Sequence, residues 1–317
     1  MIDRFNTPQT DGIEVDLLGH SLLIKQDPNS KHLGTTVWDS SLVFVKFLER
    51  NCKKGEFSRA KLAGKRVIEL GAGCGLAGLG MALLGCDVVV SDQIEVLPLL
   101  LRNVERNLSR AKYAAADNSY MGSIGKVDVA ELDWGNETHI AAVSPPFDYI
   151  IGTDVVYKEQ YIEPLINTIL ALAGPKTTVL LGYEFRSSGV RELLSELCQK
   201  HFSVKRVLHS KMDPKYQHPD IDLYIMRVLQ KPGEDSFEKQ DGSAGNVVDQ
   251  LDESEVSGED DGECVSQQNV TESGTPIENV QRQLEASLSV SKDSVFETRR
   301  QGSLAARLLS DIVPSRP

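Results

Sequence analysis

The sequence predicts an α/β fold, in which a doubly wound, mostly parallel seven-stranded sheet with an antiparallel C-terminal strand pair is followed by a disordered acidic tail. Short apolar runs alternate with helical segments from residue 66 to residue 201, which is typical of a parallel sheet. A glycine-rich turn joins the first of these runs to a helix. The alternation stops after residue 230, where Ser, Gly, Glu, Asp and Gln dominate.

Two elements are expected before this alternation begins. Residues 13–24 alternate weakly between apolar and polar side chains, and they predict one or two short strands. Residues 35–50 carry apolar side chains at helical spacing. They predict an amphipathic helix that packs one face on the core.

Strands and helices then follow one another along the chain. Strands are predicted at residues 66–70, 87–91, 126–132, 147–153 and 177–183. Helices are predicted at residues 76–84, 95–108, 161–173 and 190–201. Two last strands, at residues 202–208 and 222–228, are separated by a loop with Pro214 and Pro219 and by no helix. We therefore expect these two strands to pair antiparallel at one end of the sheet.

The acidic charge of the chain is concentrated in its C-terminal part. The whole chain of 317 residues has a net charge of −12, and residues 231–317 hold 8 Lys and Arg against 18 Asp and Glu, a net of −10. Such a segment buries too little apolar surface to offset its ordering entropy. We expect an N-terminal extension with short strands (1–34), a folded domain (35–230) and a disordered tail (231–317). Residues 296–313 form a short amphipathic docking helix or a weakly helical, solvated tail.

The composition also indicates which kinds of partner and which cellular compartment to expect. The first 230 residues carry a net charge of only −2, whereas nucleic-acid binding needs a basic face. The five cysteines form no C-x-x-C pair, which argues against a structural metal site and favours a reduced compartment. No apolar run reaches the roughly 20 residues needed to span a bilayer. We expect a soluble monomer of the cytoplasm, with the nucleus also open, that binds no nucleic acid and no membrane.

The glycine-rich turn follows the strand at residues 66–70 and suggests a nucleotide-like cofactor. Gly73, Gly75 and Gly78 satisfy the dinucleotide pattern G-x-G-x-x-G. However, Glu69 lies two residues before Gly71, the first glycine of the turn. An acid there can bind the methionine ammonium of S-adenosylmethionine, directly or through water, and would repel a pyrophosphate. The alternative for Glu69 is an edge carboxylate that pairs with a lysine.

Two later segments complete a cofactor site of this kind. Asp92 ends the second strand of the alternation, where a carboxylate can accept both ribose hydroxyls. It could instead be an acid at the start of the next helix. Asp133 and Trp134 follow the third strand and could hold an adenine by hydrogen bonds and ring contact. Trp38 and Trp134 are the only tryptophans of the chain, and each is either a ligand contact or a rim filler.

Six segments in one order resemble the seven-β-strand S-adenosylmethionine-dependent protein-lysine methyltransferases that carry a D-x-x-Y motif, the methyltransferase-like 21 group. The segments are VWDSSLVFVKFLE (37–49), VIELGAGCGLAGL (67–79), CDVVVSD (86–92), LDWG (132–135), DYIIGTDVVYKEQYIEPL (148–165) and GYEFR (182–186). The resemblance covers residues 12–230. It is nearest to the members that methylate the valosin-containing AAA ATPase, with those that methylate Hsp70 chaperones close by.

This resemblance implies a Rossmann-like methyltransferase sheet and S-adenosylmethionine as cofactor. It implies these cofactor contacts: Trp38, Gly71, Ala72, Gly73, Asp92, Trp134 and Thr153. It places Asp154 and Tyr157 at the lysine pocket as the catalytic pair, with Glu184 at the same entrance. The implied partner is a protein substrate, either an AAA ATPase of the valosin-containing type or an Hsp70-like chaperone.

Three other functions stay open at this point. The chain could methylate a small molecule or another side chain, because only the resemblance favours protein lysine. It could bind S-adenosylmethionine without turnover and act through its tail. A nicotinamide oxidoreductase is the third, and it is the least consistent with Glu69.

Overall fold

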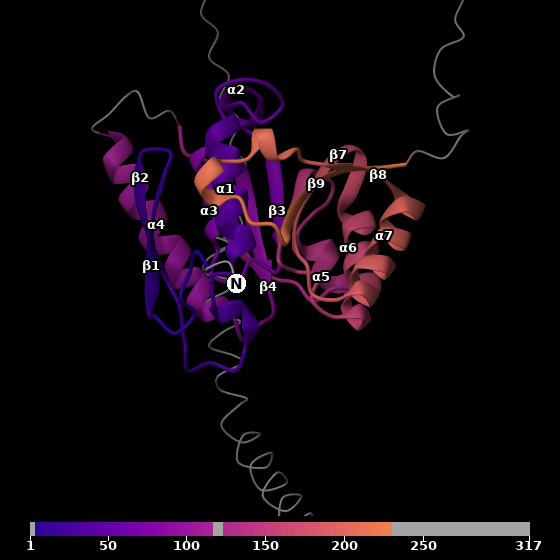
Figure 1. The fold of residues 1–317 in the computed structure, drawn as a ribbon. Helices are drawn as coiled ribbons and strands as arrows, with labels where there is room; N and C mark the ends of the chain where they lie inside the picture. The colour runs from indigo at the N-terminus through magenta and orange to yellow at the C-terminus, as the bar shows by residue number, and fades with distance from the viewer. Residues whose placement is uncertain (1–3, 117–122, 230–317) are drawn as a thin grey trace, which may run out of the picture. The chain divides into compact units, whose positions relative to one another are not determined.

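A seven-stranded sheet forms the centre of the computed structural model, which describes residues 4–116 and 123–229 (Figure 1). The strand order is β5-β4-β3-β6-β7-β9-β8. The strands are β3 (Arg66–Leu70), β4 (Asp87–Asp92), β5 (Val127–Glu131), β6 (Phe147–Thr153), β7 (Ala173–Glu184), β8 (Phe202–Arg206) and β9 (Ile221–Val228). Neighbouring pairs from β5 to β7 are parallel, whereas β9 pairs antiparallel with both β7 and β8. The predicted sheet and its antiparallel end are therefore confirmed.

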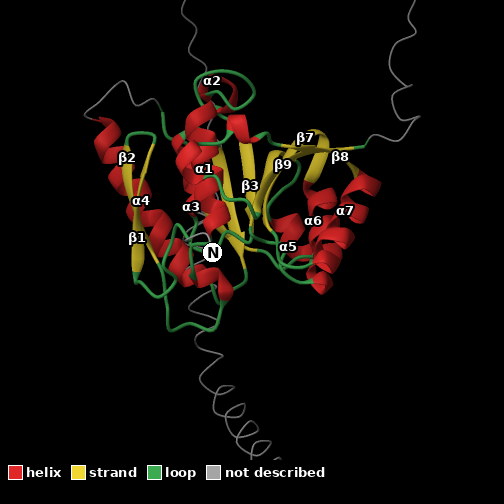
Figure 2. Cartoon of the chain, in the orientation of Figure 1, coloured by secondary structure: helices red, strands yellow, loops and turns green. Residues whose placement is uncertain are grey.

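Helices cover both faces of this sheet, as Figure 2 shows. The helices are α1 (Asp39–Asn51), α2 (Arg59–Leu62), α3 (Leu76–Leu83), α4 (Leu97–Ala116), α5 (Glu137–Ala142), α6 (Ile162–Leu172) and α7 (Ser188–His201). Buried side chains of α1, α3 and α4 form one apolar cluster with one face of the sheet. Buried side chains of α6 and α7 form a second cluster on the other face. In this part of the chain no helix is long and apolar enough to cross a membrane.

Within residues 4–116 and 123–229 the predicted elements all occur, with differences at their ends. The first helix begins at Asp39, because residues 33–35 form a 3₁₀ turn and Trp38 has extended backbone. Helix α4 continues to Ala116, eight residues beyond its predicted end at residue 108. Helices α2 and α5 were not predicted, because they are 4 and 6 residues long and α5 buries no side chain. The predictions for residues 231–317, including the helix at 296–313, lie outside the described residues.

The N-terminal strands form a hairpin that lies along α4 (Figure 1). Strand β1 (Gly12–Leu17) pairs antiparallel with β2 (His20–Lys25). Two buried asparagines of α4 bind the outer edge of β2. Asn107 accepts the Leu23 N–H at 2.8 Å and donates to the Leu23 carbonyl at 3.0 Å. Asn103 makes the same pair of bonds with Lys25, at 2.9 Å each. The side-chain amides thus substitute for a neighbouring strand.

We expect Asn107→Ala to destabilise the protein by about 1–3 kcal/mol, because both backbone groups of Leu23 lose their partner. Urea denaturation would measure this change in the free energy of unfolding. The matched control is Arg106→Ala on the exposed side of α4, which should change stability by less than about 0.5 kcal/mol. Equal effects of the two substitutions would show that the side-chain bonds to β2 do not contribute.

Candidate active site

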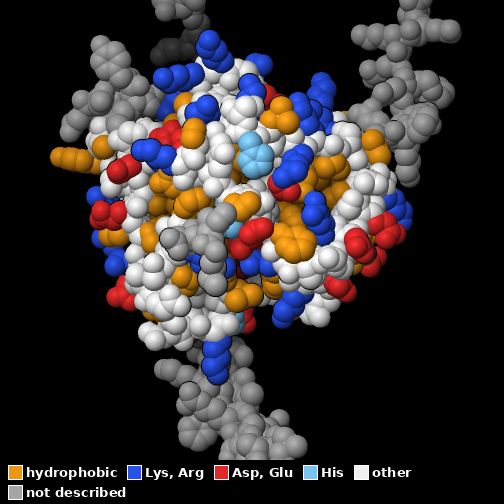
Figure 3. Space-filling view, viewed as in Figure 1, with side chains coloured by type: hydrophobic (Ala, Val, Ile, Leu, Met, Phe, Trp, Pro, Cys, Tyr) orange, Lys and Arg blue, Asp and Glu red, His pale blue; other side chains and the backbone are white. Residues whose placement is uncertain are grey.

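A cavity of about 1020 Å³ lies where β3, β4, β5 and β6 end. Parallel strands bring their carboxyl ends to one edge of the sheet, and ligands of open α/β sheets bind there. The loop that follows each of these strands contributes to the wall, and so does the 3₁₀ turn at residues 33–35. Figure 3 shows acidic, basic and hydrophobic side chains interleaved over the middle of the face viewed in Figure 1.

The glycine-rich turn forms the floor of the cavity with its backbone. Gly71 and Gly73 have φ angles of 60° and 57°, in the left-handed region that side chains disfavour. A Cβ on Gly71 would lie 2.8 Å from Val155 Cγ1, and one on Gly73 would lie 2.9 Å from the Gly34 carbonyl oxygen. Neither position has room for a side chain, so a ligand meets bare backbone here.

Asp92 closes one side of this floor. Its Oδ2 accepts the N–H of Gly73 at 2.7 Å, and its Oδ1 accepts the N–H of Gln93 at 2.8 Å. Burial raises the pKa of Asp92, and the two backbone N–H groups act in the opposite direction. A carboxylate that lines the cavity in this fixed orientation has lone pairs left for two ribose hydroxyls. This position fits the predicted role.

The two tryptophans line the same cavity. Cζ2 of Trp134 would be 3.3 Å from a Cβ on Gly71, so the indole packs close to the glycine turn. Trp38 donates its Nε1–H to the carbonyl of Leu33 at 3.0 Å, which joins the start of α1 to the 3₁₀ turn. The structure therefore places both rings on the wall rather than in the core.

Glu69 does not line the cavity, in contrast to the other predicted cofactor residues. Its side chain is 1% exposed, and Oε2 accepts the N–H of Gly78 in the first turn of α3 at 2.7 Å. Burial raises the pKa of Glu69 to about 8. The structure gives this carboxylate a structural role: it holds the start of α3 against β3 and stands behind the cofactor floor. The edge pairing with a lysine is wrong, since no salt bridge of Glu69 occurs among the described residues.

The predicted reactive residues lie at the end of β6. Asp154 is a non-glycine residue with a φ of 60°, and its N–H donates to the Gly182 carbonyl of β7 at 2.9 Å. Oδ2 of Asp154 pairs with Arg186 at 2.5 Å, whereas the buried Oδ1 has no hydrogen-bond partner in the described part of the chain. Burial raises the pKa of Asp154 to about 6, although Arg186 opposes the shift. Thr153 lines the cavity beside it.

Tyr157 lies on the same wall, with its ring centroid 5.4 Å from that of Tyr161. Burial raises the pKa of the Tyr157 hydroxyl, so the side chain stays a neutral phenol at physiological pH. The two rings give the cavity an aromatic side next to Asp154.

Sequence reasoning missed part of the site. Arg186 lines the cavity and pairs with Asp154 and Glu184. The 3₁₀ turn with Leu33 and Gly34 also lines it. The available signal for Arg186 was its place in the segment GYEFR, two residues after Glu184. Nothing in the sequence indicated the 3₁₀ turn.

These residues fit S-adenosylmethionine. The floor is a cradle that a Cβ would fill, Asp92 offers oxygens for the ribose, and the Trp134 ring lies beside the turn for the adenine. Seven of the eight predicted cofactor residues line one cavity, and Glu69 supports it from behind.

One cluster of possible metal ligands occurs in the described residues: Glu131, Asp133 and His139. His139 Nδ1 already accepts the N–H of Asp133 at 3.2 Å. That nitrogen is engaged with the backbone, and the arrangement serves to hold α5 against the end of β5.

The raised pKa of Glu69 predicts a pH-dependent stability. A folded-state pKa of about 8 against an ordinary value of 4.5 means that the folded protein binds this proton more tightly. The stabilisation is complete below pH 4.5 and is lost as the pH rises toward 8. Glu69→Gln should remove this dependence, so that the free energy of unfolding of the native chain falls relative to the variant across that window. Parallel urea-denaturation curves at every pH would contradict the prediction.

Known lysine methyltransferases are similar to this chain in sequence. A family model described as lysine methyltransferase matches residues 17–200. The protein N-lysine methyltransferase METTL21A of Danio rerio is 34% identical over 194 residues, which cover 61% of this chain and 80% of that protein. The EEF1A lysine methyltransferase 3 of Mus musculus is 29% identical, over 63% of this chain and 84% of its own. The solved T. Thermophilus 16S rRNA methyltransferase RsmC superposes with a TM-score of 0.46 at 16% identity, covering 68% and 50% of the two chains. With its glycine-floored cavity and its Asp154-x-x-Tyr157 wall, the chain belongs to the lysine methyltransferase family.

Proposed function

We propose that this lysine methyltransferase transfers methyl groups from S-adenosylmethionine to a lysine side chain of a folded protein substrate. The observation that carries the proposal is the Asp154 carboxylate: the residue lines the cavity, and its buried Oδ1 has no hydrogen-bond partner among the described residues. A buried acceptor atom without a partner is costly. An amine that reached Oδ1 from the cavity would supply the missing N–H.

The acceptor lysine must lose its proton before it can attack. With an ordinary pKa of about 10.4, deprotonation at pH 7 costs roughly 4.6 kcal/mol. A buried site lowers this cost, because desolvation and nearby positive charge both disfavour the ammonium. Asp154 is 9% exposed, so an amine beside it leaves bulk water.

Bound S-adenosylmethionine supplies an electrophilic methyl group on a sulfonium, and transfer leaves S-adenosylhomocysteine. Asp154 accepts an N–H of the neutral amine and aims its lone pair at the methyl carbon. Tyr157 walls the pocket and offers a ring face to the nitrogen as it becomes cationic. Alignment of the two reactants provides most of the rate. The chain needs no dedicated general base, because the amine's proton can leave to water before the N–C bond forms.

We also propose which proteins carry the substrate lysine, which membership of the family alone does not specify. The segments around Trp38 and Asp154-x-x-Tyr157 resemble enzymes that act on the valosin-containing AAA ATPase and on Hsp70 chaperones. Among the matched relatives, one is named for EEF1A as its substrate. We propose an AAA ATPase of the valosin-containing type first, with the Hsp70-type chaperone second. A cytoplasmic location, with access to the nucleus, and a monomeric state belong to the same proposal.

The experiment incubates the full chain with tritiated S-adenosylmethionine and three purified proteins: a valosin-containing AAA ATPase, an Hsp70 chaperone and EEF1A. Label on one of them, at a lysine found by mass spectrometry, would support the proposal and identify the substrate class. Label only in small molecules of a cell extract would favour the small-molecule alternative. Cofactor binding without any label would favour the non-catalytic module.

We expect Asp154→Asn to reduce methyl transfer by at least about 100-fold while cofactor affinity changes by less than about threefold. Asparagine tolerates the left-handed backbone that Asp154 adopts, so the variant tests the charge rather than the fold. Transfer is measured by label incorporation and cofactor affinity by calorimetry. Glu192→Gln on the exposed side of α7 is the control. Activity retained in Asp154→Asn would remove this residue from the mechanism.

We expect Gly73→Ala to weaken binding of S-adenosylmethionine by at least about tenfold. The new Cβ would lie 2.9 Å from the Gly34 oxygen and would strain a φ of 57°. Calorimetric titration measures the loss. Gly55→Ala, at a φ of 83° with no atom within 4 Å of the new Cβ, is the control for backbone strain alone. If both variants bind the cofactor like the native chain, the turn is not its floor.

A further inference from the structure

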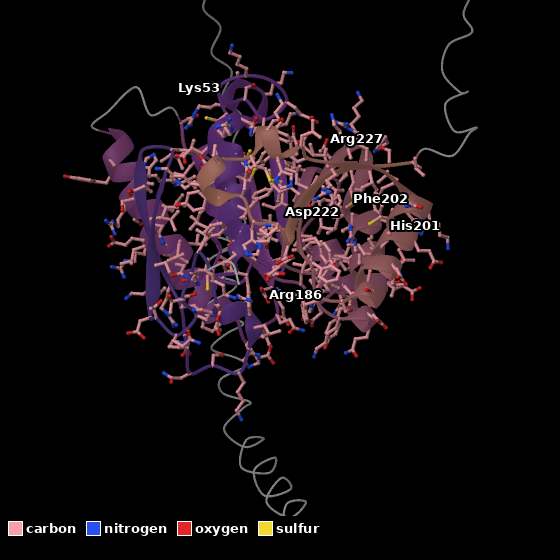
Figure 4. All side chains as sticks on the ribbon, in the orientation of Figure 1. Lys53, Arg186, His201, Phe202, Asp222 and Arg227 are labelled. Atoms are coloured by element: carbon pink, nitrogen blue, oxygen red, sulfur yellow. The ribbon has the colours of Figure 1, made fainter. Side chains whose placement is uncertain are left out.

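A positively charged side chain, that of Arg186, lies on the acceptor side of the cavity. One Arg186 nitrogen lies 2.5 Å from Oδ2 of Asp154 and 3.1 Å from Oε2 of Glu184. The Asp154 side chain is 2% exposed and the Arg186 side chain 25%. Figure 4 shows Arg186 at the lower end of the sheet, opposite Lys53 and Arg227. The guanidinium therefore lies near the end of β7, in the lining of the cavity.

Three elements contribute charges to this position. Glu184 ends β7 and Arg186 follows it by two residues, whereas Arg4 reaches Glu184 from the N-terminal segment at 3.6 Å. The guanidinium carbons of Arg4 and Arg186 lie 5.5 and 5.6 Å from the Trp38 ring centroid. The Asp39 carboxylate at the start of α1 accepts N–H groups of the segment that carries Arg4. The phenols of Tyr157 and Tyr183 are the other titratable groups nearby, and burial raises the pKa of each.

A lone carboxylate would be a poor partner for a lysine nucleophile. It attracts the ammonium, but it also stabilises the ammonium and so keeps the proton on the nitrogen. The enzyme needs a hydrogen bond to the neutral amine without strong stabilisation of the ammonium. A fixed positive charge beside the carboxylate achieves this, because it repels the ammonium and leaves the neutral amine unaffected.

We propose that Arg186 is the fixed counter-charge of the acceptor site. It keeps Asp154 ionised and oriented through Oδ2, and it leaves Oδ1 for the acceptor amine. Its positive charge also reduces the stabilisation of the lysine ammonium by the Asp154 carboxylate. This inference rests on the proposed function for its substrate. Arg186 acts through Asp154 and is a positioning residue. The amine proton leaves to water, and the freed lone pair then forms the N–C bond as the C–S bond breaks with its electrons on sulfur.

The distribution of hydrogen bonds separates this role from a purely structural tie between β6 and β7. The backbone already joins the two strands here, through Asp154 N–H to the Gly182 carbonyl and the pairing of Thr153 with Gly182. The side-chain pair leaves two buried atoms without a hydrogen-bond partner in the described residues, Asp154 Oδ1 and Arg186 Nε. Buried atoms without a partner also occur at other described residues, Glu69 Oε1 among them, so this pair is distinguished by the fact that both of its residues line the cavity. An incomplete pair is what a site that receives a ligand requires.

The first test needs no methyl transfer. The probe is n-butylamine, a mimic of the lysine side chain, titrated into the full chain saturated with S-adenosylhomocysteine. Below about pH 9 the probe is an ammonium, so its binding should strengthen as Asp154 ionises, with a midpoint near 6, the pKa of Asp154. In Arg186→Met the midpoint should move to higher pH by about 1 unit or more. In Arg186→Lys, which keeps the charge, it should move less.

The second test is the pH profile of methyl transfer to the protein substrate that accepts label. Loss of Arg186 raises the pKa of Asp154 and that of the acceptor lysine, so both effects move the ascending limb to higher pH. We expect Arg186→Met to be at least about tenfold slower than the native chain at pH 7 and to recover as the pH rises. Arg191→Met is the matched control, because its guanidinium lies over Phe185 and outside the cavity lining.

The outcomes separate this inference from the proposed function. An equal loss at every pH, with no rescue by Arg186→Lys and no shift in butylammonium binding, would overturn the counter-charge role and leave Arg186 as a structural residue. The predicted butylammonium shift without transfer to any protein would support the counter-charge and refute the proposed substrate class. Cofactor binding measured in each variant excludes misfolding as the cause.

Discussion

The β3–α3 turn can form only where side chains are absent, and the cavity depends on it. Gly71, Gly73 and Gly75 all have positive φ, so the chain reverses from strand to helix over a few residues. At Gly78, inside α3, a Cβ would lie 2.3 Å from Val90 and 2.6 Å from Glu69 Oε2. Without these glycines α3 would stand away from β4, and side chains would occupy the floor. At Gly71 and Gly73 the cofactor surface is therefore backbone, and Asp92 and Glu69 hold this turn in place from two sides.

The acceptor half of the cavity depends on a different constraint, the register between β6 and β7. Thr153 pairs with Gly182, and the next residue, Asp154, turns into left-handed backbone while its N–H donates to the Gly182 carbonyl. This register brings Asp154 to Arg186, which is 32 residues later in the chain. The antiparallel strand β9 covers the other edge of β7. The glycines of the β3–α3 turn and the pairing at Gly182 of β7 thus fix the two halves of a single cavity.

Burial affects the acids of the two halves in different ways. On the cofactor side it raises the pKa of Glu69 and Asp92, and backbone N–H groups compensate part of the cost. On the acceptor side burial also raises the pKa of Asp154, and two guanidinium groups, those of Arg186 and Arg4, oppose this shift. Backbone donors suit a carboxylate that must stay in one place. Side-chain cations suit a carboxylate whose electrostatic surroundings must change when an amine binds beside it.

The sequence by itself determined the order of strands and helices, the antiparallel end, the glycine floor and the positions of Asp92, Trp134 and Asp154, because burial periodicity and left-handed turns leave local marks. It missed α2 and α5, which are too short to show a period. Only the tertiary structure decided that Glu69 binds the Gly78 N–H behind the cavity rather than lining it, and that Arg186 pairs with Asp154. Contacts between side chains depend on the register and the distance between elements that are far apart in the chain. The local sequence pattern contains no information on either.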